Sequence, residues 1–269
     1  MIDTLGDRMK EYEEVEAGRR FLPLLPVMAR IDGRAFHSFT KGLDRPYDAL
    51  LSTAMILATK RLAEETNALV AYTQSDEITL LWHTDREESQ IWFNGRIAKM
   101  TSQCAALATL YFYQEIDKVL PHYKVKNPTF DARVWQLPNI TEAINCLIWR
   151  QQDAVKNSIS MAAQHYFSHK QLHKKDSQEK KAMLLTKGVD WSEYPEVFKQ
   201  GVIIQKMETI SRFTTNELEK LPLKHAARQN PLLEFKRNVW VNRELPILTE
   251  IENKEQVLFK GLSPILKKL

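Results

Sequence analysis

Two stretches of the chain decide the fold. Residues Ala71–Trp82 read AYTQSDEITLLW, and residues Val27–Arg34 read VMARIDGR. Each contains an apolar run rich in strand-forming residues beside an acidic residue and a turn-forming residue. We therefore expect one strand to end at Asp32 and a tight turn to form at Asp76. If the two strands are neighbours in one sheet, the two carboxylates lie close together at one of its edges.

Hydrophobic periodicity predicts the order of elements around these stretches. The resulting order, βαββαβ, is the ferredoxin-like arrangement, in which the first and third strands are central neighbours and two helices cover one face. Asp32 and Asp76 are then expected at the same edge of the sheet. The predicted fold class is α+β, a polymerase-type palm with added helices and a C-terminal extension, and this fold alone does not fix a function. Strands are expected at 24–31, 69–73, 78–82 and 130–137, and long helices at 48–66 and 90–120.

Three regions follow from this reading. A palm-like catalytic core with an N-terminal helix is expected over residues 1–138. An extension of helices and a strand, packed on the core, is expected over 139–210. Residues 211–269 are predicted to form a basic C-terminal tail, because prolines divide this region into short pieces.

Composition indicates a globular chain with a mild positive charge. Hydrophobic residues make up 43% of the 269 positions, which is ample for a core, and no apolar run reaches the length of a membrane-spanning helix. The first residues resemble no targeting segment, so a cytoplasmic location is expected. Cys104 and Cys146 lie in apolar contexts and are predicted to be free thiols.

The charge distribution is more informative than the net charge of +4. Between Lys220 and Arg243 six basic residues stand against Glu234 as the single acidic residue. Such a cluster is consistent with contact to a nucleic-acid backbone. A solvated surface is the simpler alternative and is favoured by composition alone.

Asp32 and Asp76 are candidate metal ligands. Two neighbouring carboxylates repel each other unless a cation or a proton neutralises them. Mg²⁺ is typically held by one or two carboxylates, with water and phosphate completing its shell. The alternative is that both are ordinary turn residues. Glu77 is either a third acidic residue of the catalytic site or an exposed strand residue.

Residues beside the first turn are candidates for binding phosphate. Where a turn leads into a helix, backbone amides such as those from Gly33 to His37 can point at an anion. Arg45 and Ser75 carry side chains that can neutralise or hydrogen-bond to a triphosphate. The chain has no Gly-rich loop here, so the alternative is that each of these is an ordinary surface residue.

A polar face is predicted on a later helix. Arg150, Asp153 and Asn157 fall three and four positions apart, which places them on one side of a helix. This face can recognise phosphate and base edges, or it can be a surface ladder of ion pairs, which the spacing alone slightly favours.

Four motifs occur in a consistent order. They are IDGRAFHSF at 31–39, QSDE at 74–77, FDARV at 130–134, and WRQQDA at 149–154 followed by Asn157. With these motifs the chain closely resembles the tRNA-His guanylyltransferase family over roughly residues 4–206. The resemblance implies a nucleotidyltransferase that adds nucleotides in the 3′-to-5′ direction to the 5′ end of tRNA. ATP would activate a 5′-monophosphate, and the 3′-hydroxyl of GTP would then attack it.

The resemblance also implies roles for individual residues. Two Mg²⁺ ions would be held by the carboxylates of Asp32 and Asp76 and by the backbone oxygen of Gly33. Asn157 and Lys187 would help to handle the nucleotide or the tRNA. The implied substrates are ATP, GTP and tRNA, and the implied assembly is a homotetramer, which the broadly apolar helix at 90–120 also suggests. The triphosphate would be lined by Gly33, Arg34, Ala35, Phe36, His37, Arg45 and Ser75.

Three positions depart from the family pattern. Eukaryotic members have a His-Ile-Asn-Asn run after the Trp-Arg-Gln motif, whereas residues 155–158 of this chain read VKNS. Arg45 stands where lysine is usual, and Thr73 stands where glycine is frequent. The missing histidine favours the like-protein branch, whose members resemble template-dependent enzymes that repair tRNA 5′ ends. Maturation of tRNA-His is the other role within the family.

Two alternatives from other classes are weaker. A nucleotide cyclase would share the palm and the metal carboxylates, but it usually carries a Gly-Gly turn where this chain has Gln74 and Ser75. A non-catalytic RNA-binding module would need aromatic residues on its central strands, and residues 27–31 and 78–81 are without them. Dependence on a metal would separate an enzyme from a module that only binds RNA.

Overall fold

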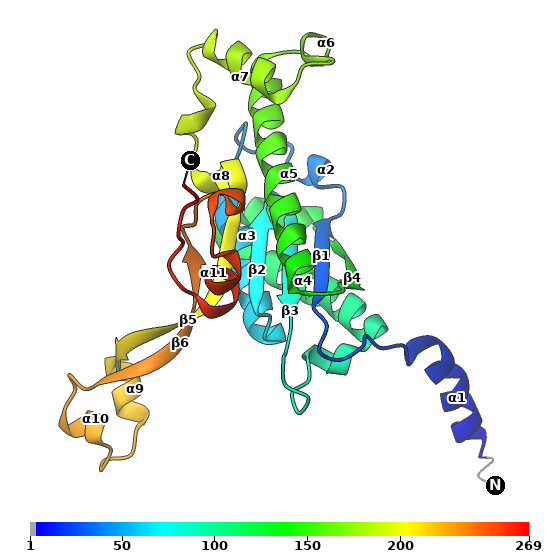
Figure 1. Ribbon diagram of the computed structural model, residues 1–269, viewed down its shortest axis with the longest axis vertical. Coiled ribbons are helices and arrows are strands. Elements are labelled where there is room, and N and C mark those ends of the chain that lie inside the picture. The colour runs from blue at the N-terminus through cyan, green and yellow to red at the C-terminus, as the bar shows by residue number, and fades with distance from the viewer. Residues whose placement is uncertain (1–3, 269) are drawn as a thin grey trace.

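The computed structural model describes residues 4–268, and in this part of the chain six strands form one antiparallel sheet (Figure 1). The strand order is β4-β1-β3-β2-β5-β6, so the first and third strands are neighbours, as the element order predicts. The mixed fold of this sheet with packed helices confirms the α+β class. The strands are β1 (Val27–Gly33), β2 (Val70–Gln74), β3 (Glu77–Trp82), β4 (Phe130–Gln136), β5 (Val202–Arg212) and β6 (Glu234–Arg243).

Strand register places three acidic residues in one row. Asp32 in β1 lies opposite Glu77 in β3 on one side and opposite Asp131 in β4 on the other. Residues directly opposite each other in an antiparallel pair share a face of the sheet. In addition, the backbone N–H of Gly33 donates to the carbonyl of Asp76 at 3.0 Å, so the end of β1 is fixed to the β2–β3 turn.

One face of the sheet is covered by two long helices, α3 (Ala49–Thr66) and α4 (Ile97–Val119). Helix α3 begins after Asp48, whose carboxylate accepts from the backbone N–H of Leu51 at 2.9 Å, a typical N-cap. Helix α4 begins later than its pattern predicts, because Phe93 and Asn94 adopt positive φ in the short helix η1 (Trp92–Gly95). The core on this face includes Ala54, Met55, Leu62, Met100, Cys104, Ala108 and Phe112.

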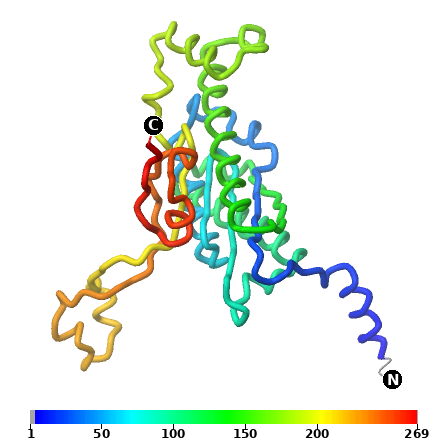
Figure 2. Tube along the Cα trace, in the orientation of Figure 1, coloured from blue at the N-terminus to red at the C-terminus, as the bar shows by residue number. Residues whose placement is uncertain are grey.

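The opposite face is covered by α5 (Ile140–Tyr166) and by the C-terminal segment of the chain. Leu147 and Ala154 of α5 pack with Met28 and Tyr72 of the sheet. In Figures 1 and 2 this helix runs from beside the sheet to the upper end of the molecule, and the C-terminal segment lies beside its lower part. That segment contributes Leu245, Leu248, Ile251, Val257 and Leu258, all nearly inaccessible to solvent.

The C-terminal region is therefore part of the folded body. The division expected between residues 210 and 211 falls inside β5, which pairs with β6 along its length. Strand β6 completes the sheet, and its Trp240 is buried in the core beneath α3 and α4. The region had the composition of a tail because charged residues alternate along the exposed half of this hairpin. We call residues 206–239, which project from the body in Figure 2, the arm.

The remaining elements are short, apart from an N-terminal helix that extends away from the body (Figure 2). Within residues 4–268, no helix is long and apolar enough to cross a membrane. Cys104 and Cys146 are free thiols, as predicted, and burial raises the pKa of Cys104 to about 12. The other helices are α1 (Leu5–Ala17), α2 (Phe36–Phe39), η2 (Pro121–Lys126), α6 (His169–Leu172), α7 (Ser177–Leu185), η3 (Trp191–Glu193), α8 (Glu196–Gln200), α9 (Thr215–Lys220), α10 (Ala226–Gln229), η4 (Leu248–Glu250) and α11 (Lys254–Lys260).

Candidate active site

Asp32 and Asp76 meet at one edge of the sheet. Asp32 is the next-to-last residue of β1, and Asp76 lies in the two-residue turn between β2 and β3, where Ser75 adopts a positive φ of 54°. The hydroxyl of Ser75 donates to Oδ1 of Asp76 at 3.1 Å. Burial raises the pKa of Asp76, and the nearby charge of Asp32 raises it further, against the lowering effect of hydrogen bonds from the backbone and from Ser75. A cation at this edge would relieve the repulsion.

The donor set at this edge fits Mg²⁺. Two carboxylates and the carbonyl of Gly33 offer hard oxygen ligands, which Mg²⁺ prefers. Within residues 4–268, no group of three or more His, Cys, Asp or Glu side chains is gathered closely enough to hold a metal by itself. A metal bound here would thus share its shell with water and with a phosphate-bearing ligand, as at phosphoryl-transfer sites.

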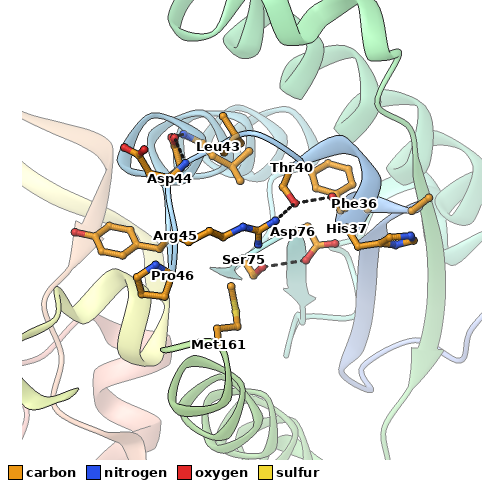
Figure 3. Close-up of a pocket in the computed structure, with 15 residues that line it drawn as sticks. Phe36, His37, Thr40, Leu43, Asp44, Arg45, Pro46, Ser75, Asp76 and Met161 are labelled. Atoms are coloured by element: carbon orange, nitrogen blue, oxygen red, sulfur yellow. Dashed lines mark hydrogen bonds between the residues drawn. The ribbon is translucent and has the colours of Figure 1, made fainter. Parts of the chain in front are cut away.

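A cavity of about 430 Å³ opens beside Asp76 (Figure 3). Arg45 reaches across it toward Ser75 and Asp76, and Met161 of α5 enters from the opposite side. The guanidinium of Arg45 donates to the hydroxyl of Thr40 at 3.4 Å. The predicted residues that the structure brings to this cavity are Gly33, Ala35, Phe36, His37, Arg45, Ser75 and Asp76.

The floor of the cavity is the turn from β1 into α2. Ala35 has a φ of 55° and precedes the helix, and the backbone N–H groups of Ala35, Phe36 and His37 donate to no acceptor in the described chain. Free N–H groups in a first helical turn attract anions. A Cβ on Gly33 would overlap with the ring of Phe36, so this position needs glycine.

Aromatic packing holds this turn in place. The ring of Phe36 lies 4.9 Å from that of Phe39, 5.4 Å from that of Phe112 and 5.1 Å from that of Phe130, measured between centroids. Phe36 and Phe39 are both buried, whereas His37 between them is exposed. The sequence pattern FHSF thus anchors the turn in the core and presents its backbone to the cavity.

Three of the predicted binding residues lie away from the cavity. Arg34 is exposed, and its backbone N–H donates to the carbonyl of Thr129. Asn157 is exposed on α5, and Lys187 follows α7, where its ammonium lies 5.7 Å above the ring of Phe167. The structure does not bring Asn157 and Lys187 to Asp76, so a contact of either with the nucleotide stays a prediction.

Glu77 is neither exposed nor free. Its two carboxylate oxygens accept from Nε and Nη2 of Arg150 at 2.7 and 2.8 Å, and Arg30 lies 3.9 Å away. Arg150 also donates to Asp153 at 3.1 Å, and the amide of Asn157 donates to Asp153 at 3.4 Å. The predicted polar face of α5 is therefore present as a ladder of polar contacts, but its first member is buried against the sheet and not on the surface.

Several residues that line the cavity were not singled out from the sequence. Met161 lies eleven positions after Arg150, about three helical turns, so helical period alone placed both on one side of α5. Tyr47 stacks on Phe198 with centroids 5.0 Å apart, a contact between distant segments that no local pattern shows. The other lining residues that were not predicted are Thr40, Leu43, Asp44, Pro46, Asp48 and Leu51.

The basic cluster between 220 and 243 is partly engaged by contacts within the chain. Lys236 pairs with Glu208 at 2.7 Å, and Arg237 pairs with Glu217 at 2.6 Å. Arg228 and Arg243 donate to backbone carbonyls, including Leu221 and Gly261 respectively. Among the described residues of the cluster, Lys236 and Arg237 are in ion pairs, and Lys220, Lys224, Arg228 and Arg243 are not. The cluster is thus less available to a nucleic acid than its sequence indicated.

Comparison with known proteins adds independent findings. A family model described as tRNAHis guanylyltransferase matches residues 6–138. The tRNA(His) guanylyltransferase of Schizosaccharomyces pombe is 30% identical over 217 residues, covering 76% of this chain and 80% of that protein. An uncharacterized protein of Acanthamoeba polyphaga mimivirus is 29% identical over 228 residues, covering 76% of this chain and 77% of that protein.

Two solved structures resemble this fold over almost the whole chain. A bacterial tRNA(His) guanylyltransferase (Thg1)-like protein in complex with ATP superposes with a TM-score of 0.77 at 34% identity, covering 95% of this chain and 97% of the other. A structure described in the same words, in complex with GTP, superposes with a TM-score of 0.72 at 32% identity, covering 95% and 98%. These matches set aside the cyclase and RNA-binding-module alternatives. The chain belongs to the tRNA(His) guanylyltransferase family and is a nucleotidyltransferase.

Proposed function

We propose that this protein adds nucleotides, GTP preferred, in the 3′-to-5′ direction to the 5′ end of tRNA. The observation that carries the proposal is that the end of β1, which carries Asp32, is bonded to the turn of Asp76, and that Asp76 lines a cavity with free backbone N–H groups and Arg45. Phosphoryl transfer needs such positioning and charge neutralisation more than any covalent help from the protein. That bacterial relatives are known in complex with ATP and with GTP supports nucleoside triphosphates as the ligands.

The reaction would proceed in two displacements. First, a 5′-phosphate oxygen of the tRNA attacks the α-phosphorus of ATP, pyrophosphate leaves, and an adenylylated 5′ end results. Second, the 3′-hydroxyl of GTP attacks the 5′-phosphorus of the tRNA, and AMP leaves. A 5′ end that already carries a triphosphate would need only the second displacement.

Two groups of residues would bind the phosphates and the metal ions. The backbone N–H groups of Ala35, Phe36 and His37 and the guanidinium of Arg45 would hold the phosphates. Asp32 and Asp76, with the carbonyl of Gly33, would hold two Mg²⁺ ions. When bound, these ions would stabilise negative charge on the reacting oxygens and favour ionisation of the attacking hydroxyl.

Within this activity we favour template-dependent repair of 5′ ends over maturation of tRNA(His). The absent histidine after the Trp-Arg-Gln motif and the match to the bacterial like-protein support this choice. The experiment uses labelled GTP with two 5′-monophosphorylated tRNA(His) substrates. One lacks only the extra guanylate, and the other is shortened by one nucleotide opposite a templating C. Faster addition to the shortened substrate supports repair, and faster addition to the first substrate supports maturation.

A homotetramer in the cytoplasm is proposed as the working form. Leu110 of α4 is 46% exposed and Leu57 of α3 is 39% exposed, so the outer surface of these two helices offers apolar side chains to another copy. Light scattering of the purified protein at several concentrations tests the assembly, and a monomer at all concentrations would contradict it.

A further inference from the structure

An ion pair between Glu77 and Arg150 lies next to the proposed metal site, because Glu77 directly follows Asp76 in the chain. Arg150 of α5 donates through Nε to one oxygen of Glu77 and through Nη2 to the other, at 2.7 and 2.8 Å. Such a two-pronged pair fixes both direction and distance. Both groups are well covered, since the side chain of Arg150 is 9% exposed and that of Glu77 is 16% exposed.

Further contacts hold the arginine in this place. Nη2 of Arg150 also donates to Asp153 at 3.1 Å, one turn further along α5. The ring of Trp149 lies 4.5 Å from the guanidinium carbon. On the sheet side, Arg30 stands 3.9 Å from the second oxygen of Glu77. The charges are therefore arranged as alternating cations and anions, from the sheet into the helix.

The location of the pair connects it to the reacting groups. Glu77 follows Asp76 in the chain, and its Cα is paired across the sheet with that of Asp32. The same helix that carries Arg150 places Met161 at the cavity three turns later. The ion pair thus joins the turn that carries Asp76 to the helix that closes the cavity.

We propose that Glu77 and Arg150 are positioning residues for the transfer reaction and that Glu77 is not a metal ligand. The inference deepens the proposed function and rests on it. The pair holds the Ser75–Asp76 turn against α5 and keeps the charge of Glu77 away from the carboxylates of Asp32 and Asp76. Without Arg150, Glu77 keeps only Arg30, 3.9 Å away, and a poorly compensated third negative charge stands beside them.

This arrangement predicts the order of kcat among three variants. Glu77→Gln removes the charge but keeps a hydrogen-bonding side chain, so we expect a loss of about tenfold in kcat. Arg150→Gln leaves the covered carboxylate of Glu77 with only Arg30, 3.9 Å away, and we expect a loss of about 100-fold. In the double variant E77Q/R150Q the covered carboxylate is removed together with its partner, and we expect at least about tenfold recovery over R150Q.

The Mg²⁺ dependence separates positioning from ligation. In E77Q the Mg²⁺ concentration that gives half-maximal rate should stay within about twofold of the wild type, because both ligands are intact. In R150Q it should change by more than about fivefold, because the freed carboxylate of Glu77 stands beside Asp76. If E77Q instead raises the Mg²⁺ requirement strongly and R150Q does not, Glu77 is a ligand and the proposal is overturned. Equal losses in R150Q and in the double variant would also overturn it.

A control and a second measurement keep the test decisive. The exposed pair of Arg212 and Glu234 on the arm, 2.7 Å apart, receives the same three glutamine changes and should show no coupling. Binding of Mn²⁺ with ATP, followed by electron paramagnetic resonance, repeats the cycle without tRNA. If wild-type protein adds no nucleotide to any tRNA, the proposed function fails. The binding cycle alone then decides the role of Glu77, with a weakened Mn²⁺ affinity in E77Q counting against positioning.

Discussion

At the residue scale, Asp76 lies where a negative charge lowers the stability of the metal-free fold. Partial burial and the neighbouring Asp32 raise the pKa of Asp76, so ionising it at neutral pH opposes folding. The folded-state pKa lies above the unfolded-state value, so stability from this group is present at low pH and is lost as the pH rises through the raised pKa. The ionised carboxylate of Asp76 is also the form that can bind a cation.

Asp76→Asn is therefore expected to stabilise the metal-free protein while abolishing activity. At pH 8 without Mg²⁺ the melting temperature should rise by roughly 2–4 °C for each kcal/mol recovered, and the gain should vanish at pH values below the ordinary carboxyl range. Mg²⁺ with ATP should stabilise the wild type and not the variant. Scanning calorimetry with and without Mg²⁺ and ATP measures both effects. A variant that is less stable at pH 8, or that responds to Mg²⁺ and ATP like the wild type, contradicts the assignment.

Gly33 is a second residue whose identity the site demands. Gly33→Ala would place a methyl group on the ring of Phe36, so the α2 turn must shift and its N–H groups must move. We expect ATP affinity to fall by about tenfold or more. Gly6→Ala in α1 is the matched control, because a methyl group there meets no close neighbour. Isothermal titration with ATP compares the two, and equal affinities would show that the turn does not hold the phosphates.

Residue-level prediction from sequence succeeded where local structure fixes the position. Asp32 and Asp76 each lie at a strand end, so the element order was enough to bring them together. Glu77 was ambiguous because its partner, Arg150, is distant in the chain and is brought close only by α5. Asn157 and Lys187 were assigned by resemblance alone, and the described geometry places neither at the cavity.

At the element scale, the arm is the feature that the sequence described least well. Strand β6 reads EFKRNVWVNR and mixes charged residues with Phe235 and Val239, a composition that is typical of a basic tail. Pairing with β5 shows it to be one half of a hairpin. The late start of α4 was also missed, because Phe93 adopts a positive φ of 51°, which a bulky residue rarely does.

On the arm, Lys220 and Lys224 are in no ion pair of the described chain, and a role in tRNA binding is testable there. Lys220→Glu with Lys224→Glu should weaken tRNA affinity about tenfold or more at low salt, because phosphate contacts are lost, and should reduce the salt dependence of binding. Lys236→Glu is the matched control, since this lysine is already engaged by Glu208. Filter binding at several salt concentrations gives both quantities. An unchanged affinity and salt slope would remove the arm from the tRNA interface.

At the scale of the whole molecule, the C-terminal segment completes the second core. Leu248, Ile251 and Val257 are almost fully buried against α5 and the sheet. Burying each such side chain contributes about 1.5–3 kcal/mol, so the segment supplies a sum comparable to the net stability of a domain. Its hydrophobic residues lie between prolines and lysines, which is why the sequence alone did not place it in the core.

Truncation after Arg243 should therefore unfold the protein or leave it insoluble. Deletion of the arm tip, residues 213–233, with a short turn in its place, should instead leave the melting temperature within a few degrees, because none of these residues belongs to the two cores that sandwich the sheet. Circular dichroism during heating compares the two proteins. A truncated chain that melts like the full chain would show that the C-terminal segment is a dispensable appendage.

The central claim, that Asp32 and Asp76 form the catalytic centre of a 3′-to-5′ nucleotidyltransferase, is tested most directly by one labelling experiment. Purified protein is incubated with Mg²⁺, ATP, labelled GTP and 5′-monophosphorylated tRNA(His) shortened by one nucleotide, beside Asp76→Ala and Asp32→Ala variants shown to be folded. We predict label at the 5′ end of the tRNA with the wild type, none with either variant, and none without Mg²⁺. Label at the wild-type rate in a folded variant, or no label with the wild type on any tRNA, would contradict the claim.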